Sequence, residues 1–163
     1  MSQRREIRTY DYVNHPYSRV RDVLVADPAA VLRAATTAAA SRAESVAAEL
    51  RVDVGGVQVG AEITTSIGEI EESGGVAGSS PVTRIAIEWQ AARRPHLFPL
   101  MSAVLSVYPL TATETQLDFL GRYEPPLGLL GDALDAMVGH RIAEASVHRF
   151  IGDVAHYLRT HVS

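Results

Sequence analysis

The sequence contains no cysteine and no lysine, so all 15 of its basic residues are arginines. The missing cysteines exclude disulfides, thiolate catalysis and zinc sites built on Cys. The missing lysines exclude Schiff-base catalysis and any phosphate-binding loop that needs a Lys. No G-x-S-x-G or H-E-x-x-H motif occurs either. The residues therefore indicate no catalytic motif, no metal site and no cofactor.

The chain also has little that would draw it to a charged or lipid partner. Its formal net charge is -4 and its pI is near 5.8, which gives no electrostatic reason for binding nucleic acid. The N-terminal "MSQRREIRTYDY" lacks the apolar segment of a signal peptide, and no later run reaches membrane-spanning length. We therefore expect a cytoplasmic protein with no nucleic-acid partner and no stable membrane insertion.

The length and composition are those of one domain covering residues 1–163. An apolar fraction of 47% and a charged fraction of 21% are ordinary for a soluble domain. A chain of this size buries roughly 70% of its unfolded surface, which allows a core and an internal cavity.

The first part of the chain predicts one strand and two short helices. Residues 6–13 are rich in Tyr, Thr, Ile and Val, as strands are. Pro16 can begin a helix with an apolar stripe that includes Val20 and Leu24. Asp27 before Pro28 is a good N-cap for a second helix. The Ala-rich continuation to about residue 48 is ambiguous between helix and loop.

From Ala48 onward the apolar period becomes two, which predicts an antiparallel meander. The expected strands are 49–54, 57–70, 83–91, 97–110 and 115–124, with a hairpin turn at Gly55 and Gly56. Pro125 and Pro126 lack the backbone N–H that a strand ladder needs, so the sheet must end there.

A long helix is predicted from about Leu129 to Val162, and it carries two apolar stripes. The first includes Leu134, Met137 and Val138. The second is rotated from it by roughly a third of a turn and comprises Val147, Phe150, Ile151, Val154 and Leu158. We expect the first stripe to face a concave sheet and the second to pack against the end of that sheet.

This order of elements is that of the helix-grip fold, and the chain resembles the START-like superfamily from Ile7 to Leu158. That superfamily includes polyketide cyclases, lipid-transfer domains and the birch pollen allergen. The segments "LFPLMSAVLSVYPL", "TQLDFLGRYEPPLGLLGDALD" and "HRIAEASVHRFIGDVAHYL" look like those of a bacterial subgroup of unassigned function. The resemblance implies an α+β fold in which a six- or seven-stranded antiparallel sheet wraps around a long C-terminal helix. It does not imply one activity, because members bind lipids or hormones, cyclise polyketides or serve as co-chaperone modules.

The inward positions of the strands and of the first helical stripe are the expected ligand-binding residues. A glycine at one such position, Gly121, indicates either a bend in the sheet or room for another group. Tyr123 could supply a hydroxyl to the ligand. The expected lining is Ile63, Ile67, Ile87, Trp89, Met101, Leu105, Phe119, Tyr123, Leu134, Met137, Val138 and Arg141.

Two groups of polar residues on the final helix allow a functional and a structural interpretation. Arg141 falls within the first apolar stripe, where it would either anchor an anionic ligand group or lie over the core with its guanidinium in solvent. His140, Glu144 and His148 recur every four residues. A metal site is one interpretation, but a straight stripe of about 11 Å is too long for three ligands to meet at one ion. An exposed polar flank is therefore favoured.

The favoured function is binding or transport of a hydrophobic or amphipathic small molecule between the sheet and the C-terminal helix. Two alternatives stay open. One is a cyclase or hydratase acting on a polyketide-like or lipid substrate, in which Tyr123 and Arg141 polarise a carbonyl and a His acts as base. The other is a protein-interaction module with a vestigial cavity. Either a monomer or a homodimer fits the sequence.

Overall fold

Five antiparallel strands form one open sheet in the computed structural model, which describes residues 4–49, 63–91, 100–124 and 132–163. The strand order is β1-β5-β4-β3-β2, so β1 pairs with the last strand of the meander. The predicted sheet of six or seven strands included one at 49–54, and residues 50–54 lie outside the described part of the chain. The strands are β1 (Arg5–Val13), β2 (Ile63–Ser73), β3 (Val82–Ala91), β4 (Leu100–Pro109) and β5 (Thr115–Glu124).

Three helices complete the described fold: α1 (Tyr17–Ala26), α2 (Pro28–Glu49) and α3 (Asp132–His161). The C-terminal helix has 30 residues and follows the double proline, as predicted. The second helix is longer than the sequence suggested, with 22 residues, because its Ala-rich continuation has high helix propensity. Its predicted cap is present, since the carboxylate of Asp27 accepts a hydrogen bond from the backbone N–H of Ala30 at 3.1 Å.

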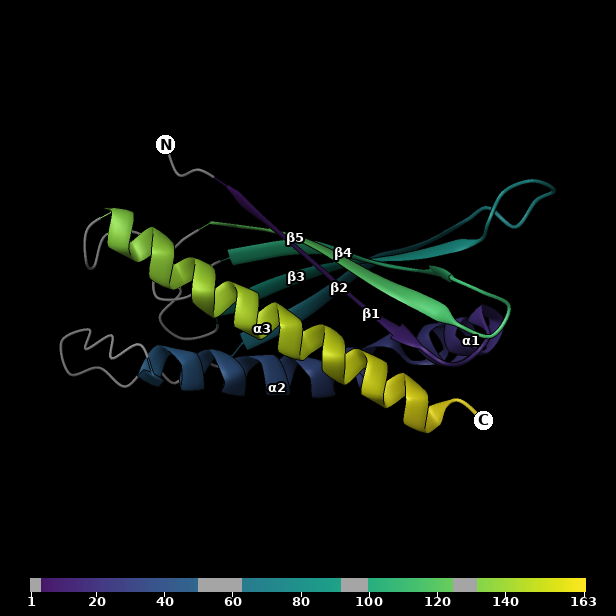
Figure 1. Cartoon of the computed structure of the whole chain (residues 1–163), viewed down its shortest axis with the longest axis horizontal. Helices are drawn as coiled ribbons and strands as arrows, with labels where there is room; N and C mark the ends of the chain where they lie inside the picture. The colour runs from purple at the N-terminus through teal and green to yellow at the C-terminus, as the bar shows by residue number, and fades with distance from the viewer. Residues whose placement is uncertain (1–3, 50–62, 92–99, 125–131) are drawn as a thin grey trace.

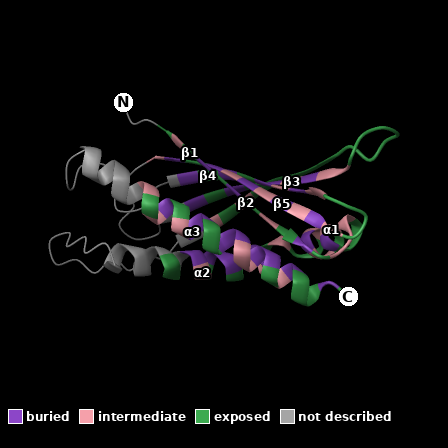
Figure 2. Cartoon of the chain, viewed as in Figure 1, coloured by how far each residue is buried: buried purple, intermediate pink, exposed green. Residues whose placement is uncertain are grey.

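The helices α2 and α3 pack side by side and cover one face of the sheet, α2 near β2 and α3 near β1 (Figure 1). We call this the inner face. Buried and less buried residues alternate along β5, which is expected of a sheet with one covered face. The second apolar stripe of the C-terminal helix is buried, as expected (Figure 2). The chain therefore has the α+β helix-grip fold that the sequence indicated.

Three aromatic side chains join the C-terminal helix to the centre of the sheet. The ring of Phe150 in α3 meets the ring of Trp89 in β3 edge to face, with centroids 4.8 Å apart. It also lies 5.6 Å from the ring of Phe119 in β5, which in turn lies 5.9 Å from Trp89. All three residues are buried. Contacts of this kind contribute about 0.5–1.5 kcal/mol per pair beyond the area they bury.

A β-bulge in β2 changes which of its residues face inward. Ile67 pairs with Ile87, but Ile70 pairs with Ile85, so Gly68 and Glu69 together oppose one residue of β3. The inward positions of β2 therefore change from odd to even numbers after the bulge. Glu72 lies after the bulge, on the side of the strand that contacts α1, and its side chain stays partly exposed.

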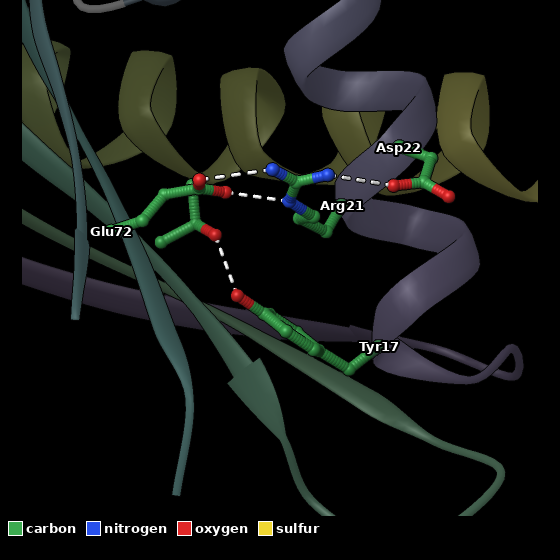
Figure 3. A network of polar contacts seen from close by, with 5 residues as sticks. Tyr17, Arg21, Asp22 and Glu72 are labelled. Atoms are coloured by element: carbon green, nitrogen blue, oxygen red, sulfur yellow. Dashed lines mark hydrogen bonds and ion pairs between the residues drawn. The ribbon is translucent and has the colours of Figure 1, made fainter. Parts of the chain in front are cut away.

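Glu72 connects β2 to α1 through the network in Figure 3. Its carboxylate accepts two hydrogen bonds from the guanidinium of Arg21, at 2.6 and 2.9 Å. Arg21 also donates to Asp22 at 2.9 Å, and the hydroxyl of Tyr17 lies 2.7 Å from that of Thr83 in β3. The bonds from Arg21 lower the pKa of Glu72 below its usual value. A bidentate ion pair thus holds α1 against the β2–β3 hairpin.

We predict that Glu72→Gln lowers the melting temperature at neutral pH, because the neutral amide cannot form the charge-assisted pair. The folded pKa of Glu72 is lowered, so its stabilisation is present above the unfolded value of about 4.3 and is lost as the pH falls through the folded value. The wild-type and Glu72→Gln melting temperatures should therefore converge in acid.

The matched control is Asp22→Asn, which removes the other carboxylate that contacts Arg21. Asp22 is more exposed than Glu72 and accepts only one bond, so its loss should change the melting temperature less. Equal effects of the two substitutions at neutral pH would contradict the structural role given to Glu72.

Candidate functional site

One row of paired residues crosses the inner face of the sheet near the ends of its strands. Thr65 pairs with Trp89, Trp89 with Met101, Met101 with Tyr123, and Tyr123 with Arg5. We call these five residues the inner row. Each lies within three residues of one end of its strand. Four of the five side chains carry an N–H or O–H group, whereas the next two rows of the inner face are almost entirely apolar.

A hydrogen bond joins Tyr123 of the inner row to His140 of α3. The phenol oxygen lies 2.7 Å from Nδ1 of the imidazole, and the two rings stack with centroids 6.3 Å apart. The hydroxyl donates when the imidazole carries its proton on Nε2, and accepts when Nδ1 is protonated. A hydroxyl and an imidazole are thus held together between sheet and helix.

The surroundings of Tyr123 keep its hydroxyl protonated. The side chain is fully buried, and burial raises the pKa of Tyr123 above its usual value of 10.0. The nearby positive charge of Arg5 opposes this increase, and the negative charge of Glu144 adds to it. Burial is the dominant cause. At neutral pH the side chain therefore offers a neutral O–H group.

Trp89 brings a second donor to the inner row. Its side chain is only 5% exposed, and its indole N–H has no acceptor among the described residues. A buried donor without a partner costs about 1–3 kcal/mol. The aromatic contacts with Phe119 and Phe150 hold the ring in this position.

The space beside Gly121 is occupied by two neighbouring side chains. A Cβ atom at this position would lie 3.0 Å from the sulfur of Met101 and 3.0 Å from a ring carbon of Phe119. The absent side chain of Gly121 therefore makes room for these two residues. The small Ala103 lies opposite Gly121 on β4. The sheet thus has little side-chain volume of its own at this point, and Met101 fills the space.

The structure describes most of the expected ligand-binding residues and places their side chains inward. Ile67 is partly buried against the core. The side chains of Ile63, Leu134, Met137 and Val138 lie outside the described residues. For every residue of the expected lining, contact with a ligand stays a prediction. The buried members are Ile87, Trp89, Met101, Leu105, Phe119 and Tyr123.

Arg141 does not point inward, so this expectation is wrong. The residue is exposed, because at ~100° per residue it lies roughly 180° around the helix from the buried Phe150. At the level of Arg141, the buried side of α3 is that of the second apolar stripe and not that of the first. An exposed Arg has no need of an anionic ligand group, so it is not retained as an anchor.

His140 is the site residue that the sequence pattern missed. It was assigned to an exposed flank with Glu144 and His148, but it is half-buried and contacts Tyr123. The signal was present, because His140 lies seven positions before Val147 and therefore extends the second apolar stripe by two turns.

Among the described residues, no group of three or more His, Cys, Asp or Glu is arranged to hold a metal ion.

Comparisons with known proteins give structural likeness without a sequence family. No family model and no curated protein sequence matches the chain. It is similar to the Zhui aromatase/cyclase from Streptomyces sp. R1128, with 12% identity and a TM-score of 0.49 over 99% of this chain and 97% of that one. It is also similar to norcoclaurine synthase from Thalictrum flavum, with 11% identity and a TM-score of 0.47 over 99% and 90% of the chains.

A third similar structure is that of Ara h 8.0201, with 7% identity and a TM-score of 0.45 over 98% of this chain and 100% of that one. The helix-grip assignment stands on the strand order and helix placement of the chain itself. None of the described helices is long and apolar enough to span a membrane.

We predict that Tyr123 ionises above the usual tyrosine value, and that this ionisation weakens the fold. Subtracting the tyrosinate absorbance titration of Tyr123→Phe from that of the wild type isolates the Tyr123 curve. Its midpoint should lie above about 10. Because the folded pKa is raised, the stabilisation is complete below the unfolded value and is lost as the pH rises through the folded one. A difference curve centred at or below 10 would contradict the burial of this hydroxyl.

Proposed function

We propose that the protein binds a largely apolar small molecule with one polar end, between the inner face of the sheet and α3. The observation that carries this proposal is the hydrogen bond between Tyr123 and His140, two polar groups held at the edge of an otherwise apolar interior. Ligand sites of this type combine an apolar lining with a few placed polar groups that fix the orientation of the ligand.

The inner face provides the two kinds of contact that such a ligand needs. Rows beyond the inner row carry apolar residues such as Ile87, Leu105 and Phe119, which would contact the apolar body. The inner row carries the hydroxyl and imidazole that would hydrogen-bond a polar end. The flexible thioether of Met101 lies between Trp89 and Tyr123 in that row and can adapt to different shapes.

A second candidate function is catalysis on a carbonyl compound, and the same pair of residues favours it. The O–H of Tyr123 can donate a hydrogen bond to a carbonyl oxygen, while the imidazole of His140 can take or supply the proton. Arg141 has no part in this arrangement because it is exposed on α3. Binding is the more direct proposal, since it needs only the hydrogen bonds that the pair can make.

The test of binding compares two probes of equal chain length, 1-decanol and decane, by calorimetric titration. Tyr123→Phe should weaken 1-decanol binding by roughly 10-fold, which corresponds to one hydrogen bond, and leave decane binding unchanged. The control is Tyr10→Phe, a change of the same chemistry at an exposed site on the outer face, and it should alter neither affinity.

Native mass spectrometry of freshly purified protein provides an independent measurement. We expect a co-purifying small molecule of low polarity, with reduced occupancy in Tyr123→Phe. Failure of both probes to bind, together with a mass equal to that of the bare chain, would argue against ligand binding and in favour of an interaction module.

A further inference from the structure

The indole N–H of Trp89 is a donor for which the fold supplies no acceptor among the described residues. The side chain is more than nine-tenths buried and the nitrogen itself is inaccessible to solvent. Water therefore does not satisfy the group from the surface. Buried indole N–H groups usually find a partner, because an unpaired donor in an apolar interior is costly. An acceptor from a bound molecule would remove this cost.

The surroundings of Trp89 favour an uncharged acceptor over an anionic one. Its ring contacts are Phe119 and Phe150, and its cross-strand neighbours are Met101 on β4 and Thr65 on β2. The hydroxyl of Thr65 lies 2.6 Å from that of Thr36 in α2, with which it is hydrogen-bonded. The backbone of Arg5, the cation of the inner row, lies three strand spacings away, roughly 14 Å, and its side chain interacts with Tyr123 rather than with Trp89. A carboxylate placed beside the indole would be desolvated without a positive partner, whereas a carbonyl or ether oxygen needs only the single N–H donor.

Met101 is the side chain whose movement would admit such a group. It pairs with Trp89 on one side and Tyr123 on the other, and its sulfur lies over Gly121. Met is unbranched with three rotatable bonds, so it can change rotamer at low cost. Rotation away from Gly121 would open space over Gly121 and Ala103, next to the indole.

We propose that the ligand carries an uncharged oxygen acceptor, such as a ketone carbonyl, which accepts the hydrogen bond of the Trp89 indole when Met101 moves away from Gly121. This inference rests on the proposed function and specifies the chemistry of the ligand. Trp89 then selects for the oxygen acceptor. Tyr123 and His140, which lie on the other side of Met101, bind either that same oxygen or a second polar group of the ligand.

The experiment uses the full 15N-labelled chain with 2-undecanone and undecane as probes. Trp89 is the only tryptophan, so its indole N–H gives a single resolved cross-peak in a proton–nitrogen correlation spectrum. The ketone should move the indole proton downfield, as a new hydrogen bond does. The alkane should bind without that downfield shift, because it has no acceptor.

Two variants separate the hydrogen bond from the space that Met101 occupies. Trp89→Phe keeps an aromatic ring in the cluster but removes the donor, so the preference for ketone over alkane should fall by roughly 10-fold. Met101→Ala keeps the donor and enlarges the space, so it should change the two affinities in the same direction and preserve their ratio. The spectra of the wild-type chain give a result even if Trp89→Phe does not fold.

The outcomes distinguish failure of the proposed ligand binding from failure of the role given to Trp89. If neither probe binds, the proposed ligand binding fails and this inference fails with it. If both bind but the ketone leaves the indole peak in place, or Trp89→Phe keeps the full ketone preference, the proposed function stands and the role of Trp89 is overturned.

Discussion

The contact of Phe150 with Trp89 and Phe119 is the interaction on which the rest of the structure depends. It fixes the C-terminal helix against two strands of the sheet, β3 and β5. Because a helix is rigid over this length, fixing it at Phe150 also sets where His140 lies, almost three turns earlier. The pairing of His140 with Tyr123 is therefore a consequence of aromatic packing, and the same packing buries the indole N–H of Trp89.

The polar groups at the two ends of the inner face differ in how fully the fold satisfies them. At one end, the paired Arg21 and Glu72 hold α1 against the β2–β3 hairpin. Both side chains are partly exposed, and both oxygens of the carboxylate accept a hydrogen bond from the guanidinium. At the other end, the inner row presents polar groups that the fold matches only in part, with Trp89 unpaired. A protein stabilised at one end can keep unsatisfied groups at the other, where the proposed ligand would complete them.

Tyr123 and His140 are compatible with both binding and proton transfer, and the difference between these functions lies in the ligand. A buried neutral phenol is a hydrogen-bond donor of fixed position, which is useful for orientation. The same donor placed against a carbonyl stabilises negative charge that develops on oxygen. The ligand proposed for this site is therefore a molecule with oxygen groups on an apolar body.

The sequence by itself determined the strand periods, the stop at Pro125 and Pro126, the capped helix after Asp27 and the apolar stripe around Phe150, because each of these follows from residues close together in the chain. Tertiary structure alone decided the bulge that turns Glu72 toward Arg21, and which of the two apolar stripes of α3 faces the sheet at the level of Arg141 and the half-buried His140. A change of register by one residue, or of helix rotation by one side chain, depends on contacts between distant segments. Local patterns do not contain that information.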